Sequence, residues 1–355
     1  MLALFPETAA IEGGELTVGG VRASALADEF GTPLVAYCER TLLAAARAYR
    51  GAAPEALLLY SVKAFPSLAV LCLFAGEGFG ADVSTLGELV FASRAGVPGE
   101  RVVVHGNNKS DEELRAAAEA GAHLVVLDAE DEVARAAAAG VGRVLVRVTP
   151  GIEADTHAAI RTAHHGSKFG LPPDDALRAI ATAREAGLEV AGLHLHVGSQ
   201  LLDTQAARTS VDWLAGFAAD CRAQFGWEPA VVDLGGGLGV GHVEGETPPP
   251  VGAFVRALLA RLEHACALHG LTLPEVVLEP GRSLVGRAGF TLYRVGRSSG
   301  PQRRRPTSRS TAGCRTTRAR SSTARGTARS SRTGPRSKRP GGTPSAASTA
   351  SPGTS

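Results

Sequence analysis

From residue 32 to residue 285 the chain alternates between short apolar runs and longer segments with helical periodicity. This alternation restricts the possible folds more than any other feature. Strands that alternate with helices form parallel sheets in α/β proteins. The apolar runs have the length of buried strands and lie at residues 33–37, 57–60, 81–83, 102–105, 124–127, 143–148, 190–196, 230–234 and 276–278. Roughly eight strand–helix units predict an α/β fold, a (β/α)8 TIM-type barrel over residues 31–285.

The residues on either side of this region do not follow the same pattern. Leu16–Val18 and Val21 are separated by Gly19 and Gly20, which predicts a hairpin rather than a barrel strand. After the barrel, residues 289–295 begin one further strand. We therefore expect strands outside the barrel at both ends of residues 1–297.

The charge of the chain is distributed very unevenly. Residues 298–355 contain 13 Lys and Arg and no Asp or Glu, whereas residues 1–297 carry a net charge of −11. The same 58-residue segment has no Val, Ile, Leu, Met, Phe, Tyr or Trp. A segment of this composition cannot bury a core and is predicted to be disordered.

This segment has two interpretations. One is a basic arm that binds nucleic acid. A slip of the reading frame is the other, because Ser310–Gly326 can be encoded so that the frame one base earlier reads VDGGMPDNPRPFLYGAR.

The cellular compartment is predicted from what residues 1–297 contain. No apolar run has the length of a membrane span, and residues 1–6 lack the basic and apolar regions of a signal peptide. The cysteines show no paired spacing, and four of them read as buried small hydrophobes: Cys38, Cys72, Cys221 and Cys266, with Cys314 in the tail. We expect a protein of the reducing cytoplasm that does not bind a membrane.

Lys63 follows the apolar run Leu57–Tyr60 and is the first candidate for chemistry. A lone lysine at a strand end is usually a surface residue whose aliphatic stem lies along the strand edge. In a parallel barrel, however, the C-terminal strand ends carry the active site. A desolvated lysine there can lose its proton and form a Schiff base with an aldehyde.

Later strands end in further polar or glycine-rich motifs. His194 and His196 share one face of a strand in HLHVGSQ, where a histidine could be structural or could cover a flat ring. Gly235, Gly236 and Gly237 expose backbone N–H groups that suit a phosphate. A dinucleotide-binding loop is the alternative, but it would come early, in a first βαβ unit.

The last strand ends in Glu279-Pro280-Gly281-Arg282. This acid and base could form only a salt bridge, or they could hold a ring nitrogen proton and an anion of one ligand. Together, a lysine, a ring-covering histidine, a phosphate loop and an acid–arginine pair make up what a pyridoxal-phosphate site requires.

The chain resembles the fold-type III pyridoxal-phosphate decarboxylases, whose barrel is like that of alanine racemase, and among them the diaminopimelate decarboxylase family. The resemblance runs from about residue 30 to residue 295. The motifs that carry it are YSVKAFPSLAVL, GADVSTLGEL, HGNNKS, SKFG (167–170), HLHVGSQ, DLGGGLG and EPGRSLV. HGNNKS and EPGRS favour this family over the ornithine and arginine decarboxylases and over a racemase of the same barrel type.

The resemblance implies an activity and a role for each motif residue. The activity is the pyridoxal 5'-phosphate-dependent decarboxylation of meso-2,6-diaminopimelate to L-lysine and CO2, the last step of lysine biosynthesis, in a homodimer without a metal. Lys63 would bind the cofactor as a Schiff base, His196 would stack on its ring and Glu279 would partner the ring nitrogen. The phosphate would be held by Ser199 and Gly235–Gly237, and Arg282 would contact phosphate or substrate. The remaining implied positions are Pro280 and Gly281 at the cofactor, with Asp82, Glu88 and Arg147 in support.

The resemblance ends near Ser298. Family members continue into a β-domain, to which residues 1–30 and 286–297 would belong, with a Cys-Glu-Ser motif that donates a proton across the dimer. Residues 298–355 contain no such motif, so catalysis by this chain as written is not expected. The out-of-frame NPRPFLYGA resembles the missing substrate-binding segment. Two alternatives stay open: another basic amino-acid decarboxylase of the same fold, and a non-catalytic cofactor-binding barrel with a nucleic-acid-binding tail.

Overall fold

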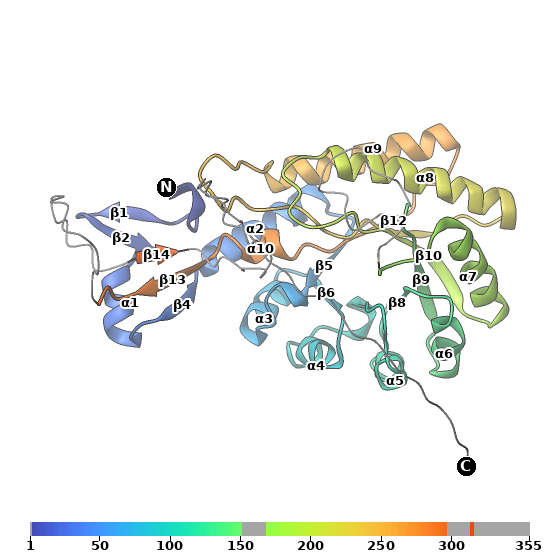
Figure 1. The fold of residues 1–355 in the computed structure, drawn as a ribbon, viewed down its shortest axis with the longest axis horizontal. Coiled ribbons are helices and arrows are strands. Elements are labelled where there is room, and N and C mark those ends of the chain that lie inside the picture. Colours follow the sequence, from blue (N-terminus) through green and yellow to red (C-terminus); the bar gives the residue numbers. More distant parts are fainter. Residues whose placement is uncertain (1, 151–167, 297–312, 316–355) are drawn as a thin grey trace, which may run out of the picture. The chain divides into compact units, whose positions relative to one another are not determined.

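A computed structural model describes residues 2–150 and 168–296, together with the backbone of residues 313–315. Eight parallel strands form a closed barrel in chain order, in which the last strand pairs with the first through Val277 opposite Leu57 (Figure 1). The strands are β5 (Leu57–Ser61), β6 (Gly80–Val83), β7 (Val102–Val104), β8 (Leu124–Leu127), β9 (Arg143–Arg147), β10 (Glu189–His194), β11 (Val231–Asp233) and β12 (Glu275–Leu278). The predicted barrel is confirmed.

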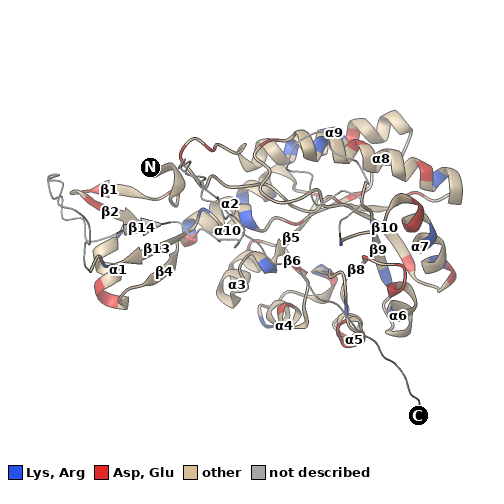
Figure 2. Cartoon of the chain, viewed as in Figure 1, with Lys and Arg blue, Asp and Glu red and all other residues tan. Residues whose placement is uncertain are grey.

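Helices surround the barrel strands (Figure 1). They are α2 (Glu39–Ala52), α3 (Leu68–Gly76), α4 (Leu86–Arg94), α5 (Asp111–Glu119), α6 (Glu132–Ala138), α7 (Pro173–Glu185), α8 (Gln205–Phe225) and α9 (Val251–His269), with short α10 (Arg282–Val285) after β12. Acidic and basic residues both occur on the outer helices α7, α8 and α9 (Figure 2). Because charges of both signs are mixed there, these helices do not form the basic surface that nucleic-acid binding requires.

The inside of the barrel is filled by apolar side chains. One cluster contains residues from every barrel strand except β6. Its members are almost fully buried: Leu59, Val103, Leu124, Val126, Leu145, Ala191, Val231 and Val277. A larger cluster joins the outward strand faces to the helices. Since the interior is packed, a ligand site has room only above this layer, where the strands end.

One predicted barrel strand belongs to another sheet. β4 (Leu34–Tyr37) pairs antiparallel with β13 (Gly289–Tyr293), so the barrel begins with α2 and β5 rather than at residue 31. An apolar run of four residues has the same pattern in either sheet, and its pairing partner lies more than 250 residues away in sequence. Within the predicted tail, β14 (Gly313–Arg315) adds to β13. The rest of the predicted disordered segment lies outside the described residues.

The N-terminal residues form η1 (Leu2–Leu4), β1 (Ala10–Glu12), β2 (Glu15–Val18), β3 (Val21–Arg22) and α1 (Ala23–Phe30). The predicted hairpin is confirmed, with Val18 opposite Val21. Val18 and Ala23 share a buried cluster with Phe290 and Leu292 of β13. The two ends of residues 1–297 therefore pack together outside the barrel.

Two further observations concern surface properties. Cys72 on α3 is exposed, so the expectation that it is buried was wrong, whereas Cys38, Cys221 and Cys266 are buried. The helix in which Cys72 lies has apolar residues on every side, so its periodicity does not indicate which side faces the core.

No helix in the described part of the chain combines the length and apolar character needed to cross a membrane.

Candidate active site

Lys63 lies in a single turn of 3-10 helix, η2 (Val62–Ala64), directly after β5. Its Nζ donates a hydrogen bond of 2.6 Å to Oδ2 of Asp82, a fully buried residue of β6. Ser61 Oγ donates to the same oxygen at 2.5 Å. Because β5 and β6 are neighbours in the barrel, their adjacent C-terminal ends bring this lysine and carboxylate together.

The charge on Lys63 differs from the expectation that it is desolvated and neutral. Its side chain is 56% exposed, because it extends beyond the strand end. The partial desolvation that remains favours the neutral amine, but the carboxylates of Asp82 and Glu279 outweigh it and raise the pKa of Lys63. Lys63 is therefore an ammonium ion held in place until a reaction partner removes its proton.

Asp82 should accordingly control the pH at which Lys63 becomes reactive. We expect Asp82→Asn to lower the pKa of Lys63, because the substitution removes the carboxylate that contributes most to stabilising the ammonium form. The rate at which the chain attaches pyridoxal phosphate should then rise at a lower pH than in the parent protein. Stopped-flow absorbance against pH measures this rate. Asp212→Asn, at a partly exposed ion pair with Arg261 between α8 and α9, should leave the profile in place.

Four buried titratable side chains meet below Lys63 at the ends of four strands. His105 Nε2 forms a short hydrogen bond with Glu279 Oε1, and His194 Nε2 lies 3.8 Å from Glu279 Oε2. Asp233 Oδ1 accepts the backbone N–H of Gly235 at 2.8 Å. The ligand-type atoms of His105, His194, Asp233 and Glu279 all lie within 4.8 Å of one another.

Burial and mutual contact separate the charges of these groups. Burial lowers the pKa of His194 to about 4. Burial, reinforced by Glu279, raises the pKa of Asp233 well above its usual range. Burial alone would also raise the pKa of Glu279, but His105 and His194 outweigh it and hold that pKa well below its usual range. The cluster therefore contains one anion, Glu279, beside a neutral Asp233. We assign this cluster to proton sharing rather than to metal binding. A metal ion needs deprotonated ligands, and the one anionic carboxylate, Glu279, already accepts a hydrogen bond from His105.

The glycine loop after β11 fits closely against its neighbours. A Cβ on Gly235 would lie 2.6 Å from His196 Nδ1, and one on Gly236 would lie 2.3 Å from Glu279 O. Gly235 also has φ +65° and Gly237 φ +111°, values that side chains other than glycine rarely adopt. The loop backbone therefore packs against His196 and Glu279 without room for side chains, and such a backbone can closely approach a phosphate.

A methyl group at Gly236 should disturb this loop. We expect Gly236→Ala to push the loop away from Glu279, to weaken binding of pyridoxal phosphate about tenfold or more, and to cost about 1–3 kcal/mol of stability. Fluorescence titration and thermal unfolding measure the two effects. Gly216→Ala on α8 is the matched control, because a Cβ there meets nothing within 4 Å. Unchanged cofactor affinity in Gly236→Ala would contradict the cradle assignment.

The remaining predicted residues surround the same opening. Arg282 Nε donates to Ser199 Oγ at 3.4 Å. Pro280 O accepts the N–H of Ser61 at 3.1 Å, and a Cβ on Gly281 would lie 3.0 Å from Ala64 Cβ. The end of β12 is thus fixed against the turn that carries Lys63.

Glu88 and Arg147 lie at the edge of this group. Glu88 Oε2 accepts the N–H of Ser84 at 2.6 Å, and burial raises its pKa. Arg147 Nη1 is 3.2 Å from Asp128 Oδ1, and its guanidinium lies over the Phe169 ring. Burial lowers the pKa of His196 to about 3, and the positive charge of Arg147 is the next largest cause of this shift. His196 is therefore neutral.

His105, Asp233 and Lys109 have no individual role predicted from the sequence. His105 and Asp233 stand at strand ends, the same signal that singled out Lys63. Lys109 of HGNNKS is buried and donates 2.7 Å hydrogen bonds to Gly106 O and Val126 O. It also pairs with Glu132 at 3.0 Å, so it ties the loop after β7 to the end of β8.

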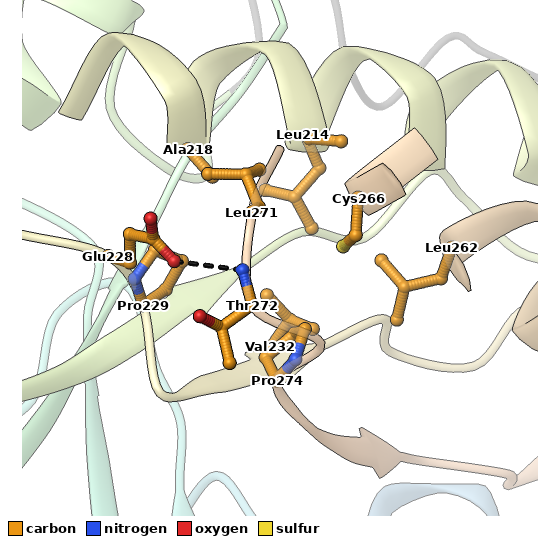
Figure 3. A pocket seen from close by; sticks show the side chains of 11 residues that line it. Leu214, Ala218, Glu228, Pro229, Val232, Leu262, Cys266, Leu271, Thr272 and Pro274 are labelled. Atoms are coloured by element: carbon orange, nitrogen blue, oxygen red, sulfur yellow. Dashed lines mark hydrogen bonds between the residues drawn. The ribbon is translucent and has the colours of Figure 1, made fainter. Parts of the chain in front are cut away.

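A hollow with mainly apolar walls lies at the opposite end of the barrel from the candidate active site. Figure 3 shows it between α8 and α9, where the chain enters β11 and β12, with a single marked hydrogen bond from Thr272 N to Glu228. Its walls are mainly apolar, among them Leu214, Leu262, Cys266, Leu271 and Pro274. It contains none of the residues at the C-terminal strand ends and is separate from the candidate active site.

Comparison with known proteins identifies the family of this chain. The family model for the pyridoxal-dependent decarboxylase pyridoxal binding domain matches residues 39–286. A diaminopimelate decarboxylase of Actinosynnema pretiosum subsp. auranticum is 41% identical over 297 residues, which cover 82% of this chain and 67% of that protein. The diaminopimelate decarboxylase of Halalkalibacterium halodurans is 36% identical over 305 residues, which cover 82% of this chain and 70% of that protein. The solved diaminopimelate decarboxylase of M. jannaschii in complex with L-lysine has a TM-score of 0.78 at 31% identity, over 83% of this chain and 71% of the other.

The chain belongs to the pyridoxal-dependent decarboxylases, a family of carboxy-lyases. Within that family it belongs with the diaminopimelate decarboxylases. The residues present fit the cofactor of this family. Lys63 can bind its aldehyde, Glu279 is an anion suited to the ring nitrogen, and the glycine loop forms a cradle that any side chain would fill.

Proposed function

We propose that this barrel catalyses the decarboxylation of meso-diaminopimelate to L-lysine and CO2. The observation that carries the proposal is the meeting of Lys63, Asp82 and Glu279 at one mouth of the barrel, beside the glycine loop. This is the arrangement that an aldehyde cofactor with a ring nitrogen and a phosphate requires. The substrate follows from the curated relatives at 36–41% identity.

Each residue has a physical role in this proposal. Pyridoxal phosphate, when bound, supplies the electron sink for the electrons released as CO2 leaves. Lys63 supplies the amine that holds the aldehyde, and Asp82 holds that amine in place. Glu279, an anion, would keep the ring nitrogen protonated.

The other residues fix the position of the cofactor. His196, which is neutral, would lie against one face of the cofactor ring and would not repel the protonated nitrogen. The phosphate would lie against the backbone of the Gly235–Gly237 loop and Ser199, with Arg282 supplying the positive charge; the Gly235 N–H is already donated to Asp233, so the loop N–H donors for the phosphate would be those of Gly236 and Gly237. Pro280 and Gly281 hold the end of β12, and with it Glu279, close to the turn that carries Lys63.

Substrate profiling tests the proposal. CO2 release and product formation would be measured with pyridoxal phosphate and, separately, meso-diaminopimelate, L-lysine, L-ornithine and L-arginine. We expect turnover of meso-diaminopimelate at least about 100-fold above the others. A preference for ornithine or arginine would assign the chain to another basic amino-acid decarboxylase.

The assay needs two forms of the protein. We propose that residues 298–355 are translated out of frame, which their composition and the alternative reading VDGGMPDNPRPFLYGAR support. The chain as printed should then bind the cofactor with turnover at background, whereas the chain with the earlier frame restored should produce lysine. Sequencing the gene across codons 290–330 tests the slip. The same frame in several independent clones, or lysine production by the printed chain, would contradict it.

The proposal extends to assembly and location. We propose that the restored enzyme is a cytoplasmic homodimer, because the resemblance implies that each protomer completes its partner's site. Sedimentation of the restored chain should give a dimer, and a monomer with full activity would contradict this.

A further inference from the structure

We propose that His105 is a positioning residue that holds Glu279 as an oriented anion for the ring nitrogen of the cofactor. This inference rests on the proposed function and adds a residue to which the family motifs gave no individual role. It assigns His105 an action through Glu279 rather than a contact with substrate.

The geometry places His105 where it can act on Glu279 and on little else. Both side chains are almost completely buried, and His105 Nε2 is hydrogen bonded to Glu279 Oε1. An ionised carboxylate has no proton to give, so His105 donates the proton of this bond. His105 Nε2 lies 3.8 Å from Asp82 Oδ1, and the His105 ring meets the edge of the His194 ring at 5.0 Å between centroids. The ring is therefore confined on three sides.

The charges around Glu279 explain why a donor is needed there. Burial of this carboxyl favours its neutral form, and the acids Asp82 and Asp233 at the neighbouring strand ends add no positive charge. His194 is too far from Glu279 Oε2, at 3.8 Å, for a good hydrogen bond. Without the His105 donor, the hydrogen bond and charge interaction that contribute most to lowering the pKa of Glu279 would be lost, and burial would favour its neutral form more strongly. The titratable groups that face it are Lys63, Asp82, His105, His194, His196 and Asp233.

Cofactor binding by the full 355-residue chain tests this role without requiring turnover. Pyridoxal phosphate would be titrated into the parent protein, His105→Leu and His105→Gln between about pH 6 and pH 9, with absorbance and fluorescence as readouts. Leucine keeps the volume and removes the donor, whereas the glutamine amide reaches about as far as Nε2 and can donate. His264→Leu, at an exposed histidine of α9, is the matched control.

The expected result is specific to a donor. His105→Leu should bind the cofactor about tenfold or more weakly at the acidic end, with affinity recovering as rising pH ionises Glu279. His105→Gln should remain within about threefold of the parent. If His105→Leu does not melt cooperatively, His105→Asn replaces it, because its shorter amide cannot reach Glu279.

Two results would count against different claims. Parent-like affinity of His105→Leu, or of His105→Asn in its place, at every pH overturns the role of His105 and leaves the proposed function standing. A parent chain that forms no bound-cofactor absorbance overturns the proposed function itself, and this inference with it.

Discussion

Lys63→Ala is expected to abolish the covalent attachment of pyridoxal phosphate and to lower turnover by the restored enzyme by about 10³-fold or more. The reason is that Lys63 supplies the amine held at the barrel mouth, and an amine supplied from solution lacks the advantage of prepositioning. The absorbance band of the bound cofactor would disappear, and single-turnover assays would measure the rate loss.

Lys63→Arg separates chemistry from charge. A guanidinium keeps the positive charge beside Asp82, but it stays protonated and cannot form a Schiff base. We expect this variant to melt near the parent temperature and to lack the bound-cofactor band. If Lys63→Arg kept the band, another lysine would hold the aldehyde, and the assignment of Lys63 would be wrong.

Glu279→Gln is expected to reduce turnover by the restored enzyme by about 100-fold or more, with a small change in KM. The amide keeps the size of the side chain and removes the negative charge that keeps the ring nitrogen protonated, so the loss falls mainly on the transition state. Steady-state kinetics with meso-diaminopimelate measure kcat and KM separately.

Glu275→Gln is the matched control for this variant. Glu275 lies at the exposed beginning of β12, the strand whose other end leads to Glu279. We expect parent-like kinetics there, because the residue is at the end of the barrel that lacks the site. Equal losses in both variants would show that the effect of Glu279→Gln is structural.

The sequence was sufficient to predict the barrel and that the candidate site residues meet at one end of it, for a physical reason. A closed parallel barrel brings all C-terminal strand ends to one rim, so Lys63, His196, the glycine loop and Glu279 had to lie near one another once the strands were assigned. Their roles in binding remain predictions. Pairing partners were harder to predict, as β4 shows: Leu34–Tyr37 is equally suited to either sheet, and its partner β13 is distant in sequence.

Charge states were not predictable from residue types alone. A lysine at a buried strand end suggested a neutral amine, but its side chain extends beyond the strand and meets Asp82. The bond between His105 and Glu279 depends on the relative heights of β7 and β12 in the barrel, which periodicity does not specify. His105 and Asp233 could be recognised as polar strand ends, but the groups that they contact follow only from the three-dimensional structure.

The central claim is that Lys63 is the residue that binds pyridoxal phosphate. The most direct test is to load the purified chain with the cofactor, reduce the bond with borohydride, digest the protein and locate the pyridoxyl group by mass spectrometry. We predict one modified peptide, with the group on Lys63. Modification of Lys109 or Lys168 instead, or of no lysine, would contradict the account.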